Sequence, residues 1–543
     1  MAIARRLYFY LVAGAALALW TVGTVWLLRA LFIALWELLA QPAIVTDPEV
    51  FRRQVSVSVA LLVVGFPIWV VHWWLVQRSL RDDNERRSAI RAFFFTAVLL
   101  VTFGFWLSSA TEFLRLLLLR LSGLGGAPEA GPVRMLEELA VLLPTLAVWV
   151  AHARVARAEH RSLPLHGPAD WFPRLYAYGA AAVGLSLLVV GAAGLLETGL
   201  AALFGGSPVF GSFRWQLATD TALAVAGLVA WSLHWGESLG LVAGPAPAAD
   251  RERRASLRWI YLGFVVFASL AGLLVALAVL LETVLRWALG VTELTGASLA
   301  RALLDPLAWA LPLALVWWYH RTTMQREASV LAARPQVGAD WAFGVTRALL
   351  YLAAFAGLAF AVFGVGALLG FFLRVLVAAV SGTTIGPWRD QLAFVLSTAL
   401  VGGAAWLWFW RQVLRRTLDD PGAEAASLSR RVYLYGTLGL SVLVILGAAG
   451  VVVYRLVTWF LGISTASAAL SAAAPALGYT IVAAAVLAFH LAILLADART
   501  AAQRPVTRTV QLVLRLPPDS DPDAVLRDLA DRLPPGAVLE RAT

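Results

Sequence analysis

The segment RLYFYLVAGAALALWTVGTVWLLRALFIALW, residues 6–36, decides the fold class of this chain. Residues 8–36 carry a single charge, that of Arg29. A helix rises about 1.5 Å per residue, so roughly 20 apolar residues cross the hydrocarbon of a bilayer. We therefore predict a membrane-spanning helix. A cleaved signal peptide is a poor fit, because the apolar run is too long and the same pattern returns further along the chain.

The composition supports a membrane protein. Hydrophobic residues make up 60% of the 543 residues and charged residues only 14%, against about 45–50% and about 25% in soluble domains. Cysteine and lysine are both absent, which excludes disulfides, thiolate chemistry and lysine Schiff bases. The formal net charge of +10 fits the anionic headgroups of membrane lipids and requires no nucleic acid.

Apolar segments of spanning length recur in pairs, at about 8–36, 54–77, 92–119, 135–153, 175–203, 215–235, 259–289, 302–320, 348–377, 391–411, 432–462 and 475–496. An arginine, usually followed by tyrosine, opens each pair, at positions 6, 91, 174, 258, 347 and 431. The successive spacings are 85, 83, 84, 89 and 84 residues, and such a regular period indicates internal duplication. We predict six hairpin repeats, over residues 1–80, 81–160, 161–240, 241–328, 329–417 and 418–500.

Two further motifs mark the second helix of the pairs. Arg-x-Gln opens it at Arg52, Arg214 and Arg389, and Trp-x-x-His closes it in four copies. The fifth copy ends in Trp406-x-x-Phe409 and the sixth in Leu487-x-x-His490. With these motifs, residues 5–496 resemble a bacterial, Chloroflexi-type family of tandem two-helix membrane repeats, which is catalogued only as a domain of unknown function. The resemblance implies the architecture and no activity.

The arginines also predict the orientation. The N-terminus and the segments between pairs hold 24 of them, the segments within pairs hold 12 and the tail holds 7. Short cytoplasmic loops carry the excess of basic residues. We therefore predict a multi-pass protein of the cytoplasmic (inner) membrane with both termini in the cytoplasm.

Residues 501–543 have a different pattern. TRTVQLVLRL (507–516) alternates like a half-buried strand, DPDAVLRDLADRL (521–533) has helical spacing, and AVLER (537–541) resembles a second strand. So short a segment is too small for an independent core. The whole chain is thus predicted to be an all-α integral membrane protein of twelve transmembrane helices, in six tandem αα-hairpin repeats. A small cytoplasmic α+β tail, βαβ-like, would dock on the membrane domain or pair with a second copy.

The Trp-x-x-His motif lies beside arginines at the predicted cytoplasmic surface. Tryptophan is favoured at that depth because its ring is amphipathic, so we interpret Trp69, Trp149, Trp231 and Trp317 as interface anchors. Histidine on the same helix face could donate to lipid phosphates or neighbouring carbonyls, or could sense pH. Imidazole is also a common ligand of haem iron. The candidates for haem or pigment ligation are His72, His152, His234, His320 and His490.

A polar side chain recurs near the outer end of each first helix, as Arg29, Arg115, Glu197, Glu282, Arg374 and Arg455. Only the third and fourth repeats have acids there, and both add a second acid early in the following helix. Charge inside a membrane is costly and marks functional sites. These groups form either interfacial ion pairs, such as Glu282 with Arg286, or an outward-facing cation vestibule of Glu197, Asp220, Glu282 and Asp305.

The chain lacks the phosphate-binding, metalloprotease and serine-hydrolase motifs that carry recognisable chemistry. We therefore predict no enzyme, no catalytic residue, no metal site and no resident cofactor. The first hypothesis is a scaffold or accessory subunit whose partners are membrane lipids and another membrane protein. The second is a channel or transporter for a small solute, ion or lipid. The third is a haem- or pigment-binding membrane protein.

Overall fold

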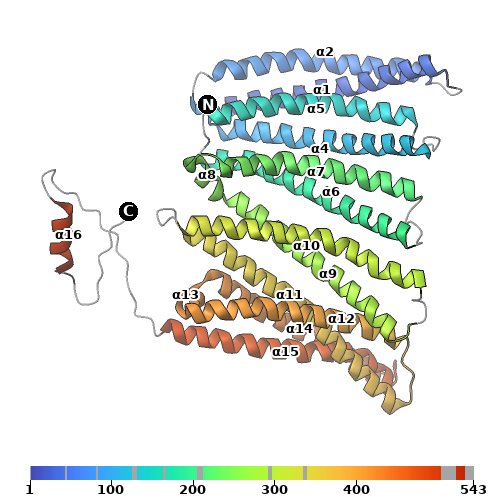
Figure 1. The fold of residues 1–543 in the computed structure, drawn as a ribbon, viewed down its shortest axis with the longest axis vertical. Coiled ribbons are helices and arrows are strands. Elements are labelled where there is room, and N and C mark those ends of the chain that lie inside the picture. The colour runs from blue at the N-terminus through green and yellow to red at the C-terminus, as the bar shows by residue number, and fades with distance from the viewer. Residues whose placement is uncertain are drawn as a thin grey trace.

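The computed structural model describes most of the chain. The described residues are 2–42, 46–80, 83–124, 131–162, 165, 167–204, 212–291, 296–333, 339–502, 521–531 and 533. Within them, twelve helices are long and apolar enough to cross a membrane. They succeed one another as helical hairpins, and Figure 1 shows these packed side by side.

The first helices of the hairpins are α1 (Ala2–Ala40), α4 (Ala89–Leu119), α6 (Trp171–Leu203), α9 (Ser256–Ala288), α11 (Ala339–Ser381) and α14 (Leu428–Phe460). The second helices are α2 (Pro48–Ser79), α5 (Pro132–Ser162), α7 (Phe213–Ala243), α10 (Gly296–Ala332), α12 (Trp388–Asp419) and α15 (Ala466–Ala502). Between hairpins lie α3 (Asp83–Arg86), α8 (Ala246–Arg253), α13 (Pro421–Ala426) and the 3-10 helix η3 (Gly167–Asp170). A π-helical turn, η1 (Arg120–Leu124), extends α4.

The bundle has two ends. We call the end that carries the segments between hairpins, including α8 and α13, the linker end; it is on the left in Figure 1. The turn end carries the loops that join the two helices of one hairpin. Several helices start at a side-chain cap, as when Ser212 and Ser427 accept hydrogen bonds from backbone N–H groups. At the turn end, α4, α9, α11 and α14 are each followed or closed by a glycine with positive φ, namely Gly123, Gly290, Gly382 and Gly462.

The helices form an open, two-layered row. Consecutive first helices contact each other from α1 through α4, α6, α9 and α11 to α14. The second helices cover this layer, each of them packed against its own hairpin partner. Helices α1 and α2 lie at one end of the row, and α14 and α15 lie at the other (Figure 1). The arrangement is that of a solenoid, in which each repeat contacts only its neighbours.

Each first helix packs against both helices of the following hairpin, and this pattern repeats along the whole row. Helix α1 packs on α5 and α4, α6 packs on α10 and α9, and α11 packs on α15 and α14. We call these groups unit 1 (α1–α5), unit 2 (α6–α10) and unit 3 (α11–α15). Between units, α4 contacts α6 and α7, and α9 contacts α11 and α12. The joint between units therefore occurs twice within one chain, and at the second joint α10 also contacts α11.

Small residues let the two helices of a hairpin approach closely. A Cβ atom added to Gly227 of α7 would meet the backbone of Leu188 in α6, and one added to Gly191 would meet the backbone of Ala224. The hairpin α11–α12 has the same close approach at Gly402. Without a hydrophobic driving force between helices in lipid, close backbone packing of this kind holds a hairpin together.

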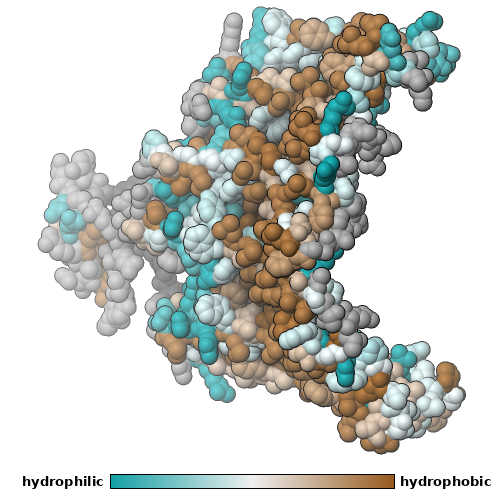
Figure 2. Space-filling model, turned by 45° about the vertical axis from the view of Figure 1, so that its right-hand side comes forward, coloured by the Kyte–Doolittle hydropathy of each residue, from teal (hydrophilic) through white to brown (hydrophobic). Residues whose placement is uncertain are grey.

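Figure 2 shows an apolar band along the row, with hydrophilic residues gathered mainly at its borders. Large apolar side chains such as Val63, Phe264 and Leu443 are exposed on the outside of the spanning helices. An outer surface of this kind suits lipid as the solvent. The chain is therefore a polytopic membrane protein.

The tail differs from its prediction. The described residues of the tail contain one helix, α16 (Pro522–Asp531), within the segment predicted to be helical. No strand occurs among the described residues, so the α+β character of the tail is not supported. The predicted strands 507–516 and 537–541 lie outside the described residues.

Candidate functional site

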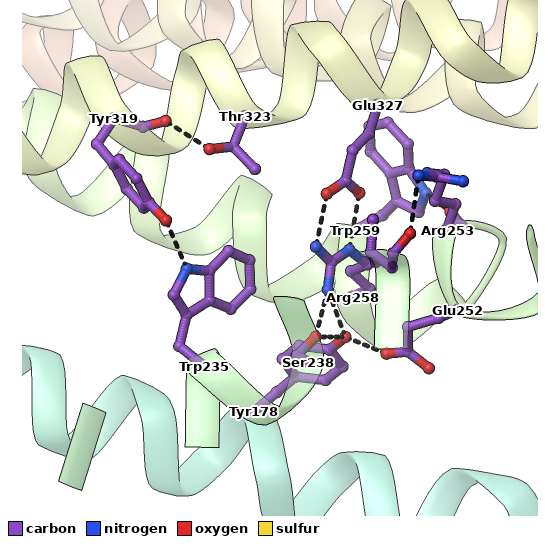
Figure 3. A network of polar contacts seen from close by, with 11 residues as sticks. Tyr178, Trp235, Ser238, Glu252, Arg253, Arg258, Trp259, Tyr319, Thr323 and Glu327 are labelled. Carbon is purple, nitrogen blue, oxygen red and sulfur yellow. Dashed lines mark hydrogen bonds and ion pairs between the residues drawn. The ribbon is translucent and has the colours of Figure 1, made fainter. Parts of the chain in front are cut away.

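A cluster of arginine, tyrosine and carboxylate side chains fills the linker end of each unit. In unit 2, Arg258 of α9 is fully buried. Its Nε and Nη2 donate to the Glu327 carboxylate of α10 at 2.7 and 2.5 Å, a two-pronged ion pair (Figure 3). Its Nη1 donates to the hydroxyl of Tyr178, 3.2 Å away on α6, and to Ser238 of α7. One guanidinium therefore joins all four helices of the unit.

The tyrosine extends this network to a second ion pair. The Tyr178 hydroxyl donates to Glu252 of α8, as Figure 3 shows, and Arg174 donates to the same carboxylate at 3.0 Å. Two arginines thus face two glutamates around one phenol, which makes this set of five side chains neutral. Such pairing is what allows charge to remain buried at low dielectric. We call this set of five residues the arginine cluster of a unit.

Unit 1 repeats the cluster. Arg91 donates to the Glu159 carboxylate at 2.8 and 2.5 Å and to the Tyr10 hydroxyl at 2.9 Å. The second pair joins Arg6 to Glu85 at 2.7 Å. Each residue takes the place of its counterpart in unit 2.

Unit 3 contains the third copy. Arg430 donates to the Asp497 carboxylate at 2.6 and 3.0 Å and to the Tyr351 hydroxyl at 3.2 Å. Tyr351 donates to Glu424 at 2.6 Å, and Arg347 lies 3.1 Å from the same carboxylate. The prediction that Arg431 opens the sixth hairpin was wrong by one residue, because Arg430 makes the cluster contacts. Arg431 is exposed, and its buried neighbour holds the equivalent place.

Aromatic rings pack beneath each cluster. In unit 2 the rings of Tyr178 and Tyr261 are 5.3 Å apart, Trp235 lies 5.1 Å from Tyr261, and His320 lies 5.7 Å from Trp235. Unit 1 repeats this set with Tyr10, Phe94, Trp73 and His152, and unit 3 repeats it with Tyr351, Tyr433, Trp410 and His490. The tryptophan comes from the first hairpin of the unit and the histidine from the second, so the rings tie the two hairpins together.

The repeated histidines use their nitrogens within the protein. Nδ1 of all five lies 2.8 or 2.9 Å from the carbonyl four residues earlier. A neutral ring that donates from Nδ1 can only accept at Nε2. Tyrosine hydroxyls donate to the Nε2 atoms of His234, His320 and His490, at 2.8, 3.4 and 3.0 Å. Ligation of an iron centre at these three positions would first require breaking those bonds.

His152 of unit 1 lacks this partner. Nε2 of His152 is buried and has no hydrogen-bond partner among the described residues. Phe94 stands where units 2 and 3 have Tyr261 and Tyr433, so no hydroxyl is available. His72 differs from the others because its ring is partly exposed.

The sequence suggested that the tryptophan–histidine motif faces lipid headgroups, but most of its histidines are turned away from the surface. His152, His234, His320 and His490 are buried between helices. Trp149 is also buried, and its N–H donates to the Tyr176 hydroxyl at 2.5 Å across the joint between units 1 and 2. The other three predicted anchors are partly buried. The N–H of Trp231 donates to Tyr261 at 3.3 Å, that of Trp69 has no partner among the described residues, and Trp317 lies under Arg321.

The four acids of the predicted vestibule fall into two separate groups of charges. Asp220 of α7 is 8% exposed and accepts one hydrogen bond, from Thr198 at 3.3 Å. Glu197 lies within electrostatic range of Asp220 and Asp305. Glu282 belongs to another group of charges, around Arg286 and Asp390.

The expected ion pair of Glu282 with Arg286 does not form. Arg286 instead donates to Asp390 of α12 at 2.7 Å, across the joint between units 2 and 3. Two residues one helical turn apart were the sequence's obvious pair, but the packing of α9 on α12 offers the arginine a closer carboxylate. Arg286 is therefore neutralised by a carboxylate of the next unit and not by one of its own helix.

We did not predict the cluster carboxylates from the sequence, although their spacing carries a signal. Glu85, Glu252 and Glu424 are 167 and 172 residues apart, and Glu159, Glu327 and Asp497 are 168 and 170 apart. This period is twice that of the arginines, because odd and even hairpins take their acids from different places. A search at the doubled period would have found the four-helix unit.

Comparison with known proteins agrees with this grouping. The model of a family described as "Domain of unknown function (DUF5671)" matches the chain three times, over residues 6–147, 174–329 and 347–485. Each match begins at the first arginine of a unit and reaches into its fourth helix. No curated protein matches the chain, and neither does any solved structure. The chain belongs to the DUF5671 family, of which it carries three tandem copies.

Proposed function

We propose that the chain is a non-enzymatic scaffold or accessory subunit of the cytoplasmic (inner) membrane. One observation carries the proposal. The polar groups of the three arginine clusters are directed at one another, with each arginine of the second hairpin held by a carboxylate and a tyrosine hydroxyl. A satisfied network of this kind makes a framework rigid and specifies one packing. It leaves little for a substrate to bind.

The orientation follows from charge. The linker end carries most of the arginines, and by the positive-inside rule it would face the cytoplasm together with both termini. The tail would then lie in the cytoplasm, where a soluble or membrane-bound partner could reach it. A rigid open row in the membrane offers two broad lipid-facing surfaces on which other spanning proteins could assemble.

The proposal is tested by isolating the tagged chain from its own membranes in polymer nanodiscs. We expect another membrane protein to co-purify at fixed stoichiometry in mild conditions. An Asp220→Asn variant should retain this partner, because the residue lies in the turn-end half of the unit, away from the arginine cluster. Isolation of the chain with lipid alone, combined with solute flux by the reconstituted chain, would contradict a scaffold.

Transport is the second candidate, and Asp220 favours it. This carboxylate is buried in a spanning helix and has no ion-pair partner among the described residues, while Glu197 and Asp305 lie within electrostatic range of one another. An uncompensated acid within a membrane is a common mark of an ion pathway. If the chain carries a cation, Asp220→Asn should abolish flux into proteoliposomes, and Asp390→Asn, which alters an acid in the Arg286 pair, should not. Equal flux in the wild type and in Asp220→Asn would exclude this pathway.

A further inference from the structure

The arginine of the Arg-x-Gln motif forms a joint between neighbouring units at the turn end. Arg214, the second residue of α7, donates to the backbone carbonyl of Ser122, 2.9 Å away in unit 1. That carbonyl belongs to the turn that ends α4, where Gly123 has a φ of 82°. The C-terminal carbonyls of a helix carry partial negative charge and attract a cation.

The joint between units 2 and 3 uses the same contact. Arg389, the second residue of α12, donates to the carbonyl of Gly290 at 3.1 Å. Gly290 ends α9 with a φ of 72°. The role of this motif is therefore to attach a second helix to the preceding unit.

Both halves of this contact are unpaired at the ends of the row. Arg52 is the equivalent arginine in unit 1: it stands 20 residues before His72, as Arg214 stands 20 before His234. It is exposed and makes no side-chain hydrogen bond or ion pair within the described part of the chain. At the other end, Gly462 closes α14 with a φ of 72°, the same as at Gly290. No described side chain donates to the carbonyls of this turn.

The apolar face of the joint is also repeated and left open. Leu107 of α4 and Leu274 of α9 are 4% and 5% exposed because units 2 and 3 cover them. Their equivalent in α14 is Leu446, counted from the cluster arginine, and it is 62% exposed. Phe103 and its equivalent Val442 show the same contrast, with the phenylalanine buried and the valine exposed.

The matching surface at the other end is open as well. Ala226 of α7 is buried in a core that it shares with Leu107 and Phe103 of α4, whereas its equivalent in α2, Val64, is exposed. Both open surfaces are apolar, and each lies on the helix that forms the joint inside the chain. The last and first helices of the row are thus two complementary halves of a joint that the chain already makes twice.

We propose that copies of this chain associate head to tail in the membrane, with α14 of one copy packed against α1 and α2 of the next. Arg52 of the second copy would donate to the carbonyls at Leu461 and Gly462 of the first. The proposal rests on the scaffold function and names its partner as a second copy. A head-to-tail contact is heterologous, so it builds a ring if its rotation closes and a filament if it does not.

The absence of cysteine allows a direct test by site-specific cross-linking. We would prepare Arg52→Cys and Leu461→Cys as separate chains in lipid nanodiscs and native membranes, and treat them with a short bismaleimide. A cross-linked dimer should form when the two are mixed and not with either alone. A double variant, Ser122→Cys with Arg214→Cys, is the matched positive control, since these residues meet within one chain and should cross-link without forming a dimer.

Each alternative result has a distinct meaning. A dimer with one single variant alone would show a symmetric contact and overturn the proposal. No dimer in the mixture, with the positive control working, would show that lipid, another protein or the tail of the same chain covers the two ends, and would also overturn it. Loss of the mixed dimer in Leu446→Trp, with the dimer retained in the exposed-site control Leu228→Trp, would place the contact on the predicted face of α14. If a partner protein co-purifies while no dimer forms, the scaffold function stands and the self-association fails.

Discussion

Arg258 and Glu327 are 69 residues apart in the sequence, and two hydrogen bonds of 2.7 and 2.5 Å join them between α9 and α10. The same relationship joins Arg91 to Glu159 in unit 1, and Arg430 to an aspartate in unit 3. Because these groups are buried, removing one partner leaves a charge that has neither water nor a counterion.

Replacing Arg258 by methionine should destabilise the chain strongly. The Glu327 carboxylate would be buried without its partner, which costs about 3–5 kcal/mol. Equilibrium unfolding in mixed micelles measures this loss. The matched control is Arg53→Met, which breaks an exposed pair with Glu49 and should cost about 1 kcal/mol or less. Equal losses in the two variants would show that the buried pair does not hold unit 2 together.

Removing both partners should be milder than removing one. The double variant Arg258→Met with Glu327→Leu leaves no unpaired buried charge, and apolar replacement of a buried ion pair is often neutral or stabilising. We expect it to recover most of the stability lost in Arg258→Met in the same unfolding measurement. A double variant that is as unstable as the single one would point to a role for the arginine beyond pairing, since Tyr178 and Ser238 also accept from it.

A single hydroxyl should complete the ring set of unit 1. Phe94→Tyr would offer the buried Nε2 of His152 the donor that Tyr433 gives His490 in unit 3. A net hydrogen bond contributes about 1 kcal/mol, so the midpoint of thermal unfolding should rise. The reciprocal change, Tyr433→Phe, should lower it by removing a 3.0 Å bond. Destabilisation by Phe94→Tyr would mean that the space beside His152 cannot accept the hydroxyl.

Two glycines of α7 should respond in opposite ways to alanine. A Cβ at Gly227 would meet the backbone of Leu188 in α6, whereas a Cβ at Gly236 would meet nothing within 4 Å. We expect Gly227→Ala to cost about 1–3 kcal/mol through overpacking. Gly236→Ala should stabilise by up to about 1 kcal/mol through helix propensity. Similar effects of the two substitutions on the unfolding free energy would contradict the close approach of α6 and α7.

The lengths of the apolar runs predicted twelve spanning helices, and the recurring arginines predicted their arrangement in hairpins. Both features are local, because a bilayer fixes helix length and the cluster arginines stand at helix starts. The grouping into units is not local. Arg6 and Arg91 look alike in sequence, but the first pairs with a carboxylate in the following linker and the second with one at the end of its own hairpin. A period of about 84 residues conceals that difference.

The wrong prediction for the position of the histidines has a similar cause. A spacing of three residues puts Trp231 and His234 on one helix face, but it does not say what that face meets. In the folded chain it meets the tyrosines of α6 and α9, so that the motif lies between helices and not at the lipid surface. The tyrosines that follow the cluster arginines were visible in the sequence, and only packing showed that they serve the histidines of the second helices.

A side-chain-resolution cryo-electron microscopy map of the chain in lipid nanodiscs tests the central claim most directly. If the three arginine clusters are structural networks whose polar groups bind only one another, the map will show continuous density from Arg258 to Glu327 and from Tyr178 to Glu252. It will show the equivalent density from Arg91 to Glu159 in unit 1 and from Arg430 to Asp497 in unit 3, and no density of a bound molecule among these side chains. Arginines turned toward a ligand or a water-filled cavity in one or more units would contradict that claim, and would make the clusters a binding site.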